Sequence, residues 1–105
     1  MFYLTQQAYK DLKLIAVYTE ENWGKNQCVL YMKMMDEAFH RLSKEPKQGV
    51  KIDYIRKGYY KYLIGKHLIF YRIVSGLSFE ASAKKKGDVQ IVRILHQRMD
   101  VETYI

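Results

Sequence analysis

The sequence predicts an α+β fold of two layers: an N-terminal strand and an antiparallel helical hairpin, packed on a mostly antiparallel sheet. Between Ala8 and Leu42, apolar residues recur at three- and four-residue steps, as they do along one face of a helix. From Tyr59 onward the pattern changes to short apolar and aromatic runs that are typical of strands. Helices that precede the strands in this way favour a helical layer packed on a sheet.

The two helices are predicted from their apolar stripes and from the residues at their ends. Thr5 is a candidate N-cap, because its hydroxyl can accept a hydrogen bond from a free amide of the first turn. Gly24 ends the first helix, since glycine adopts the left-handed conformation without a Cβ penalty, and Pro46 and Gly49 end the second. The short connection between them predicts a hairpin. The stripes are Ala8, Leu12, Ile15, Ala16, Thr19 and Trp23, then Cys28, Tyr31, Met35, Ala38, Phe39 and Leu42.

Short apolar runs predict the strands. Gly65 and Lys66 form a two-residue link with glycine first, which favours a type II′ hairpin turn. The polar, Lys-rich segment Ser75–Asp88 is longer than a hairpin requires and is predicted to be a loop. Residues 96–105 are predicted to form a tail with an apolar end. The predicted strands are Met1–Leu4, Tyr59–Ile64, His67–Val74 and Val89–Leu95.

Length and charge limit the classes of protein. The 105 residues suffice for one domain, expected to span residues 1–105. Eighteen Lys and Arg against eleven Asp and Glu give a formal charge of +7, which favours an acidic partner, either nucleic acid or protein, although solubility alone would also explain it. The single cysteine, Cys28, excludes an internal disulfide, and neither a signal peptide nor an apolar run that could cross a bilayer is recognised. We expect a cytoplasmic protein that does not contact a membrane.

Four segments carry a resemblance to a known family. They are YTEENWG at Tyr18–Gly24, Gly58 with the aromatic strand after it, GKHLIFYRI at Gly65–Ile73, and IVRILHQRMD at Ile91–Asp100. Together they resemble the ParE branch of the ParE/RelE toxin superfamily, and the resemblance covers nearly the whole chain. It implies a RelE-like fold, from which Ser75–Asp88 departs only by its length.

The resemblance also implies a function. ParE-type toxins inhibit DNA gyrase, trap it on cleaved DNA and so block replication. A ParD-like antitoxin neutralises them by wrapping a flexible C-terminal segment over the toxin, and operator DNA is contacted only indirectly, through the antitoxin. The RelE branch shares the fold but cleaves messenger RNA on the ribosome, which makes a ribonuclease the alternative. A basic RNA- or DNA-binding module without toxicity is a third hypothesis.

RNA cleavage by 2′-hydroxyl attack needs a base, an acid and positive charge near the phosphate. The RelE branch places an arginine where this chain has His67, and it uses a basic and tyrosine set near the C-terminus, where Tyr104 is distant in sequence from His96. The match is incomplete, so we expect a non-catalytic inhibitor. The three histidines show no metal-ligand spacing, and neither a metal nor a cofactor is expected.

The residues expected to contact the target or the antitoxin lie near the strand ends and in the tail. Two alternatives stay open. Arg93 lies within an apolar strand and could instead pair with a carboxylate. The tail could reach gyrase or fold back over the sheet. His67 is expected to be an ordinary histidine at the solvent edge. The predicted contact residues are Arg72, Arg93, His96, Arg98, Met99 and Tyr104.

Overall fold

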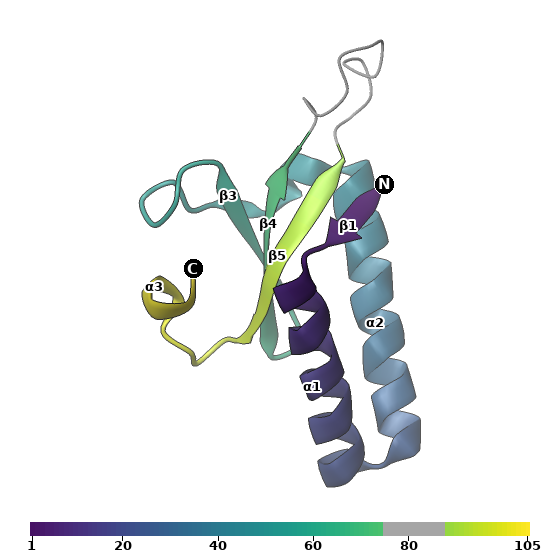
Figure 1. Ribbon diagram of the computed structural model, residues 1–105. Helices are drawn as coiled ribbons and strands as arrows, with labels where there is room; N and C mark the ends of the chain where they lie inside the picture. The colour runs from purple at the N-terminus through teal and green to yellow at the C-terminus, as the bar shows by residue number, and fades with distance from the viewer. Residues whose placement is uncertain (75–87) are drawn as a thin grey trace.

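The computed structural model describes residues 1–74 and 88–105, and Figure 1 shows their arrangement. The order of elements confirms the predicted α+β class, while the predicted loop Ser75–Asp88 lies outside the described residues except for Asp88. The elements are β1 (Phe2–Leu4), α1 (Gln6–Trp23), α2 (Lys25–Lys44), the 3-10 helix η1 (Pro46–Gln48), β2 (Val50–Lys51), β3 (Tyr59–Ile64), β4 (His67–Ile73), β5 (Val89–His96) and α3 (Val101–Tyr104).

The five strands form one sheet in the order β1-β5-β4-β3-β2. β1 pairs in parallel with β5, and the other neighbours are antiparallel, so the predicted mostly antiparallel sheet is confirmed. β2, which has two residues, was not predicted, because so short a strand has no periodic pattern. Gly65 has φ +59°, and no described residue other than glycine has a positive φ. The turn between β3 and β4 therefore has the type II′ pattern that the sequence predicts.

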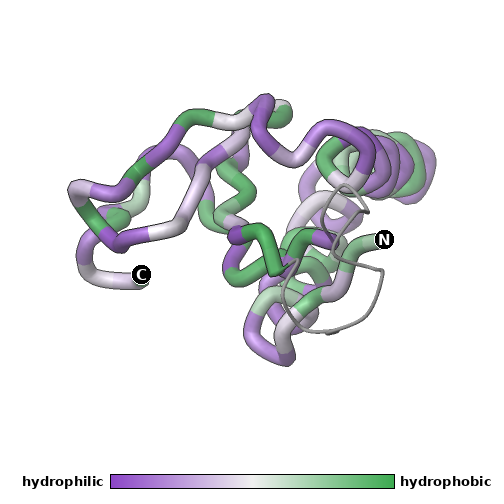
Figure 2. Tube along the Cα trace, turned by 90° about the horizontal axis from the view of Figure 1, so that it is seen from above, coloured by the Kyte–Doolittle hydropathy of each residue, from purple (hydrophilic) through white to green (hydrophobic). Residues whose placement is uncertain are grey.

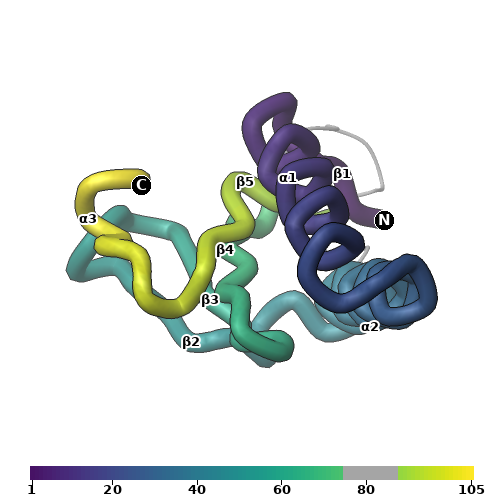
Figure 3. The backbone as a smooth tube through the Cα atoms, turned by 90° about the horizontal axis from the view of Figure 1, so that it is seen from below, coloured from purple at the N-terminus to yellow at the C-terminus, as the bar shows by residue number. Residues whose placement is uncertain are grey.

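The helical hairpin covers one face of the sheet, and Figure 3 shows α1 and α2 on the side opposite α3. Thr5 caps α1 as predicted, its Oγ1 accepting a hydrogen bond from the Ala8 amide at 3.0 Å. Gly24 ends α1 as predicted and joins it directly to α2, but the predicted left-handed helical conformation is wrong, because φ is +93° and ψ is 167°. Hydrophilic and hydrophobic residues alternate around the helices in Figure 2, as expected when only one side of each helix faces a core.

Two clusters of buried residues lie on the two faces of the sheet. The larger is between the sheet and the hairpin and includes Met35, Phe39, Tyr71 and Ile91. The smaller lies on the other face and consists of Ile52, Phe70 and Leu95, with half-buried side chains of the C-terminal segment packed against them. The predicted tail is thus partly a short helix, α3, that covers this second face.

Two polar contacts tie η1, the short helix that follows the hairpin, to the sheet. The buried Tyr71 hydroxyl donates to the Pro46 carbonyl at 2.7 Å and accepts from the Gly49 amide at 3.0 Å, which holds η1 against β4. Burial raises the pKa of Tyr71 to about 12, so this hydroxyl keeps its proton.

One residue of the predicted apolar stripes is not buried. Trp23 is 67% exposed, because the end of α1 extends beyond the sheet.

Candidate functional site

The outer edge of β5 is closed by the N-terminal segment. β1 pairs only with Val89–Ile91. Past that point the Thr5 hydroxyl donates to the Val92 carbonyl at 2.9 Å, and Asp11 Oδ2 accepts from the Ile94 amide at 3.0 Å. An open strand edge is a template for pairing with another chain. Helix α1 therefore covers the part of β5 that β1 leaves open.

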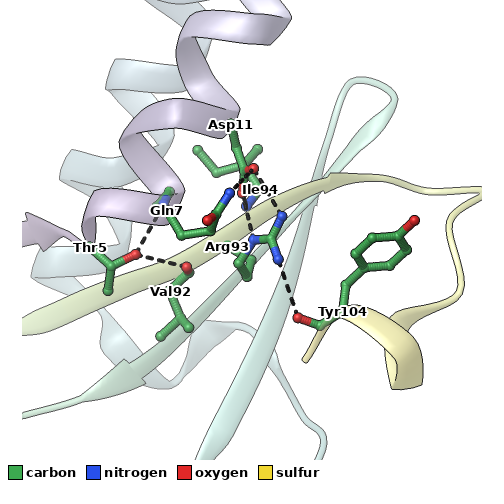
Figure 4. Close-up of polar contacts among 8 residues, drawn as sticks. Thr5, Gln7, Asp11, Val92, Arg93, Ile94 and Tyr104 are labelled. Carbon is green, nitrogen blue, oxygen red and sulfur yellow. Dashed lines mark hydrogen bonds and ion pairs between the residues drawn. The ribbon is translucent and has the colours of Figure 1, made fainter.

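Arg93 is held between α1 and α3, as Figure 4 shows. Its Nε and Nη2 donate to the two carboxylate oxygens of Asp11 at 2.8 and 3.0 Å, and its Nη1 donates to the Tyr104 carbonyl at 3.3 Å. The hydrogen bonds that Arg93 donates to Asp11 raise the pKa of Arg93, and the side chain stays charged. The alternative in which Arg93 pairs with a carboxylate is therefore present in the structure.

An irregularity in β5 sets the direction of Arg93. Phe70 pairs with Arg93 and Tyr71 with Ile91, so Val92 is an extra residue without a partner in β4. Strict alternation would turn Arg93 to the same face as Ile91, under the helices. The bulge shifts the alternation by one residue. Arg93 then shares the face of Phe70, and Ile94 enters the main core.

A groove of about 870 Å³ runs between α1 and the sheet end formed by the β3–β4 turn and the end of β5. We call it the α1–β5 groove. Its apolar lining includes Leu14, Tyr18 and Trp23 of α1, which are 68%, 62% and 67% exposed. Large apolar side chains that line a concave surface together are typical of binding sites.

The far end of the α1–β5 groove is polar and contains two imidazoles. The Lys66 amide donates to the Tyr31 hydroxyl at 3.1 Å, and Tyr31 is hydrogen-bonded to His67 Nδ1 at 2.7 Å. Burial, aided by the nearby His96, lowers the pKa of His67 to about 4. Because the Tyr31 hydroxyl already accepts from Lys66, we assign its proton to the bond with Nδ1 of neutral His67, whose own proton is then on Nε2. The prediction that His67 is an ordinary solvent-edge histidine is wrong, because it is half-buried in this network.

His96 lies beside His67 at the end of β5. The two rings are 5.4 Å apart between centroids at an interplanar angle of 78°. His96 Nδ1 accepts from the Arg98 amide at 3.2 Å, so the proton of neutral His96 also lies on Nε2. Both imidazoles have one nitrogen engaged within the protein.

The structure brings some of the predicted contact residues together and separates others. Arg93, His96 and Met99 line the α1–β5 groove. Tyr104 packs beside Arg93, whose guanidinium carbon is 5.8 Å from the ring centroid. Arg98 is exposed in the turn after β5. Arg72 is exposed on the other face of the sheet, where its Nε donates to Gln90 at 2.7 Å. A role in binding stays a prediction for all six.

Sequence reasoning missed the contribution of α1 to the groove. Leu14 and Tyr18 stand outside the apolar stripe that packs on the sheet, and this was the available signal: large apolar residues on the side of a helix that should face solvent. Asp11 carried no signal, because its partners lie 82 and 83 positions later in the chain.

The described residues offer no metal centre, since residues 1–74 and 88–105 contain no group of three or more His, Cys, Asp or Glu that could hold an ion. Within the same residues no helix is long and apolar enough to span a membrane.

Comparisons with known proteins identify first the fold and then the family. A solved structure, described as the chromosomal ParDE TA system from P. aeruginosa, matches with a TM-score of 0.68 over 90% of this chain and 92% of that chain. The two sequences are 18% identical, so this likeness shows the fold alone. The family described as the ParE toxin of the type II toxin-antitoxin system parDE matches residues 2–101. The chain belongs to the ParE toxin family.

Two curated relatives agree with this assignment. Toxin ParE1 of Mycobacterium tuberculosis is 34% identical over 101 residues, which are 96% of this chain and 93% of the relative. Toxin ParE1 of Caulobacter vibrioides is 28% identical over 102 residues, which are 97% of this chain and 94% of the relative. The similarity therefore extends over nearly the full length of each.

Proposed function

We propose that this chain is the toxin of a bacterial type II toxin–antitoxin pair, and that it acts in the cytoplasm by inhibiting DNA gyrase and so DNA replication. The observation that carries the proposal is the ParE family match over residues 2–101. The residues expected to serve binding are the six predicted ones together with the apolar lining of the α1–β5 groove.

The geometry of the polar groups supports inhibition by binding rather than by catalysis. A general acid at neutral pH needs a proton that it can give up. Because the pKa of His67 is about 4, its imidazole is neutral at pH 7 and is not available as an imidazolium acid. Arg93, which also lines the α1–β5 groove, is engaged by both oxygens of Asp11. These two observations weigh against a ribonuclease in which His67 is the general acid and Arg93 is the cation that binds the phosphate.

We further propose that a ParD-like antitoxin occupies the α1–β5 groove. Leu14, Tyr18 and Trp23 would receive apolar side chains of an antitoxin segment that orders on binding. Such ordering costs conformational entropy, which the burial of these large side chains would offset. Recognition of the operator DNA sequence in that complex would be made through the antitoxin.

Two parallel assays test the gyrase proposal against the ribonuclease alternative. The purified chain is added to a gyrase supercoiling reaction, with cleaved DNA as a second readout, and to a ribosome-programmed mRNA cleavage reaction. Loss of supercoiling with intact mRNA is expected. Cleaved mRNA with normal supercoiling would overturn the proposal in favour of the ribonuclease. The chain saturated with antitoxin is the control and should be inactive in both assays.

A further inference from the structure

The positive charge of the chain is concentrated in one part of the fold. Residues 1–45, which form β1 and the helical hairpin, contain six Lys and Arg and six Asp and Glu, so their formal charge is zero. Residues 46–74 contain seven Lys and Arg and one acid, Asp53, for a formal charge of +6 out of +7 for the chain. The basic character is thus a property of the segment that contains β2, β3 and β4.

Strand register places part of this charge on one face. Tyr59 pairs with Arg72, and Lys61 pairs with Phe70, which is buried on the face away from the hairpin. Paired residues of antiparallel strands point to the same side, as do residues two apart in one strand. Arg72 in turn pairs with Gln90 of β5. Arg56 joins this surface from the loop before β3; its guanidinium carbon is 5.4 Å from the centroid of the Tyr59 ring, and its Nη1 donates to the Ile105 carbonyl at 3.0 Å.

We call this surface the basic face; it consists of the described residues Arg56, Tyr59, Lys61, Arg72 and Gln90, none of which is acidic. Asp88, at its border, accepts from the Tyr3 hydroxyl at 3.4 Å and pairs with the Met1 amine at 3.3 Å. Asp53, the only acid of residues 46–74, is turned into its own loop, where its Oδ1 accepts from the Gly58 amide at 2.8 Å. The basic face lies on the opposite side of the sheet from the hairpin that forms most of the α1–β5 groove. Of its five residues, only Arg72 is among the predicted contact residues, and the proposed function assigns no nucleic-acid contact to it.

We propose that the basic face is a second binding surface, which contacts the phosphate backbone of duplex DNA without reading its sequence. Lys and Arg that neutralise phosphates supply most of the affinity of such binding. The Tyr59 ring already has a guanidinium over it, which disfavours its use as a platform for an unstacked base and so favours duplex over single-stranded DNA.

An acidic protein segment is the competing occupant, and the basic face suits it less well. Peptide segments gain much of their affinity from apolar side chains that enter exposed apolar pockets. Phe70, the apolar residue beneath the basic face, is fully buried, and Tyr59 is half-buried under Arg56. The exposed apolar anchors Leu14, Tyr18 and Trp23 lie instead in the α1–β5 groove.

The test measures binding of the full chain to a short fluorescein-labelled DNA duplex without gyrase or antitoxin, so it is independent of the proposed function. Each phosphate contact contributes about −0.9 to the slope of log Kobs against log salt, so three or four contacts predict a slope of about −3 between about 50 and 200 mM salt. The triple variant Arg56→Gln, Lys61→Gln, Arg72→Gln, which removes the three cations of the basic face, should reduce that slope by about 2.7 and weaken binding at least tenfold.

A charge-matched control removes three lysines from the hairpin: Lys10→Gln, Lys25→Gln, Lys33→Gln. All three lysines are exposed, and the variant has the same net charge as the first, so its affinity should fall less than threefold. Equal losses in the two variants would show attraction by net charge alone and overturn the proposal. An absence of duplex binding at about 50 mM salt would also overturn the proposal. The same holds if polyglutamate, at equal charge concentration, displaces the labelled duplex as effectively as unlabelled duplex does.

Discussion

At the scale of single residues, the Asp11–Arg93 pair joins elements from the two ends of the chain. The side chain of Asp11 is 8% exposed and that of Arg93 is 19% exposed. A charge so placed is stabilising only while its partner is present, because removal of one member leaves the other without compensation. Asp11 also accepts from the Ile94 amide, so one carboxylate both pairs a cation and completes the edge of β5.

Asp11→Ala should lower the free energy of unfolding by about 2–4 kcal/mol, since Arg93 and the Ile94 amide both lose their acceptor. Asp11→Asn should cost less, because its amide oxygen can still accept from Ile94. Urea unfolding of both variants measures the difference. A loss below about 0.5 kcal/mol in Asp11→Ala, which is the size of an ordinary surface substitution, would contradict the assigned role.

His67 makes the free energy of unfolding depend on pH. Its folded pKa of about 4 lies below the ordinary value of 6.5, so the unfolded chain binds more protons between these two values. The contribution of His67 to stability is therefore complete above pH 6.5 and is lost as the pH falls toward about 4. One pKa unit corresponds to about 1.4 kcal/mol, and partial solvent exposure reduces the loss to the order of 1–2 kcal/mol.

The comparison of the wild-type chain with His67→Gln isolates this effect, because the other titrating groups are common to both. Glutamine can still accept from Tyr31 but does not titrate. The free energies of unfolding of the two chains should converge by about 1–2 kcal/mol as the pH is lowered through this window. Parallel curves would mean that His67 is not buried in its neutral form.

At the scale of elements, α3 closes the face of the sheet that the hairpin leaves open. Val101 and Ile105 pack against Ile52, Phe70 and Leu95, and Arg56 Nη1 donates to the Ile105 carbonyl at 3.0 Å. These contacts favour the interpretation that the tail adds stability. They leave open whether it also reaches gyrase.

Deletion of Val101–Ile105 should lower the free energy of unfolding by about 2–4 kcal/mol, because two apolar side chains lose their packing and Phe70 and Leu95 become exposed. Thermal unfolding measures the loss, and a gyrase assay below the melting temperature of the truncated chain separates the two roles. Normal inhibition by the folded truncated chain would limit the tail to stability. An unchanged melting temperature would contradict the packing role.

Elements with a repeating pattern were predictable, and contacts between distant segments were not. The Thr5 cap, the Gly24 junction and the Gly65-Lys66 turn follow from local chemistry and are confirmed. The bulge at Val92 has no local signal, so the direction of Arg93 could not be derived from alternation. The hydrogen bond between Tyr31 and His67 joins residues that are 36 positions apart in the chain, and no periodic pattern predicts such a contact.

At the scale of the whole molecule, two different surfaces are separated. The hairpin side has no net formal charge and exposes large apolar side chains, whereas residues 46–74 carry a formal charge of +6. An apolar groove suits a partner that folds onto it, while a basic sheet face suits a polyanion. We therefore expect that both surfaces can be occupied at once. In a binding experiment with antitoxin and duplex DNA together, the affinity of the chain for each partner should be unchanged by the other.

The position of exposed leucines provides a sharp test of the antitoxin proposal. Leu14 is 68% exposed in the α1–β5 groove, and Leu30 is 60% exposed on α2, outside its lining. Because both side chains are largely solvated in the free chain, Leu14→Glu and Leu30→Glu should each change the melting temperature little. Leu14→Glu should weaken antitoxin binding at least thirtyfold, about 2 kcal/mol, since it places an unpaired charge against an apolar segment. Leu30→Glu should weaken it less than threefold, with calorimetric titration as the measurement. Equal affinities for the two variants would exclude the groove as the antitoxin site.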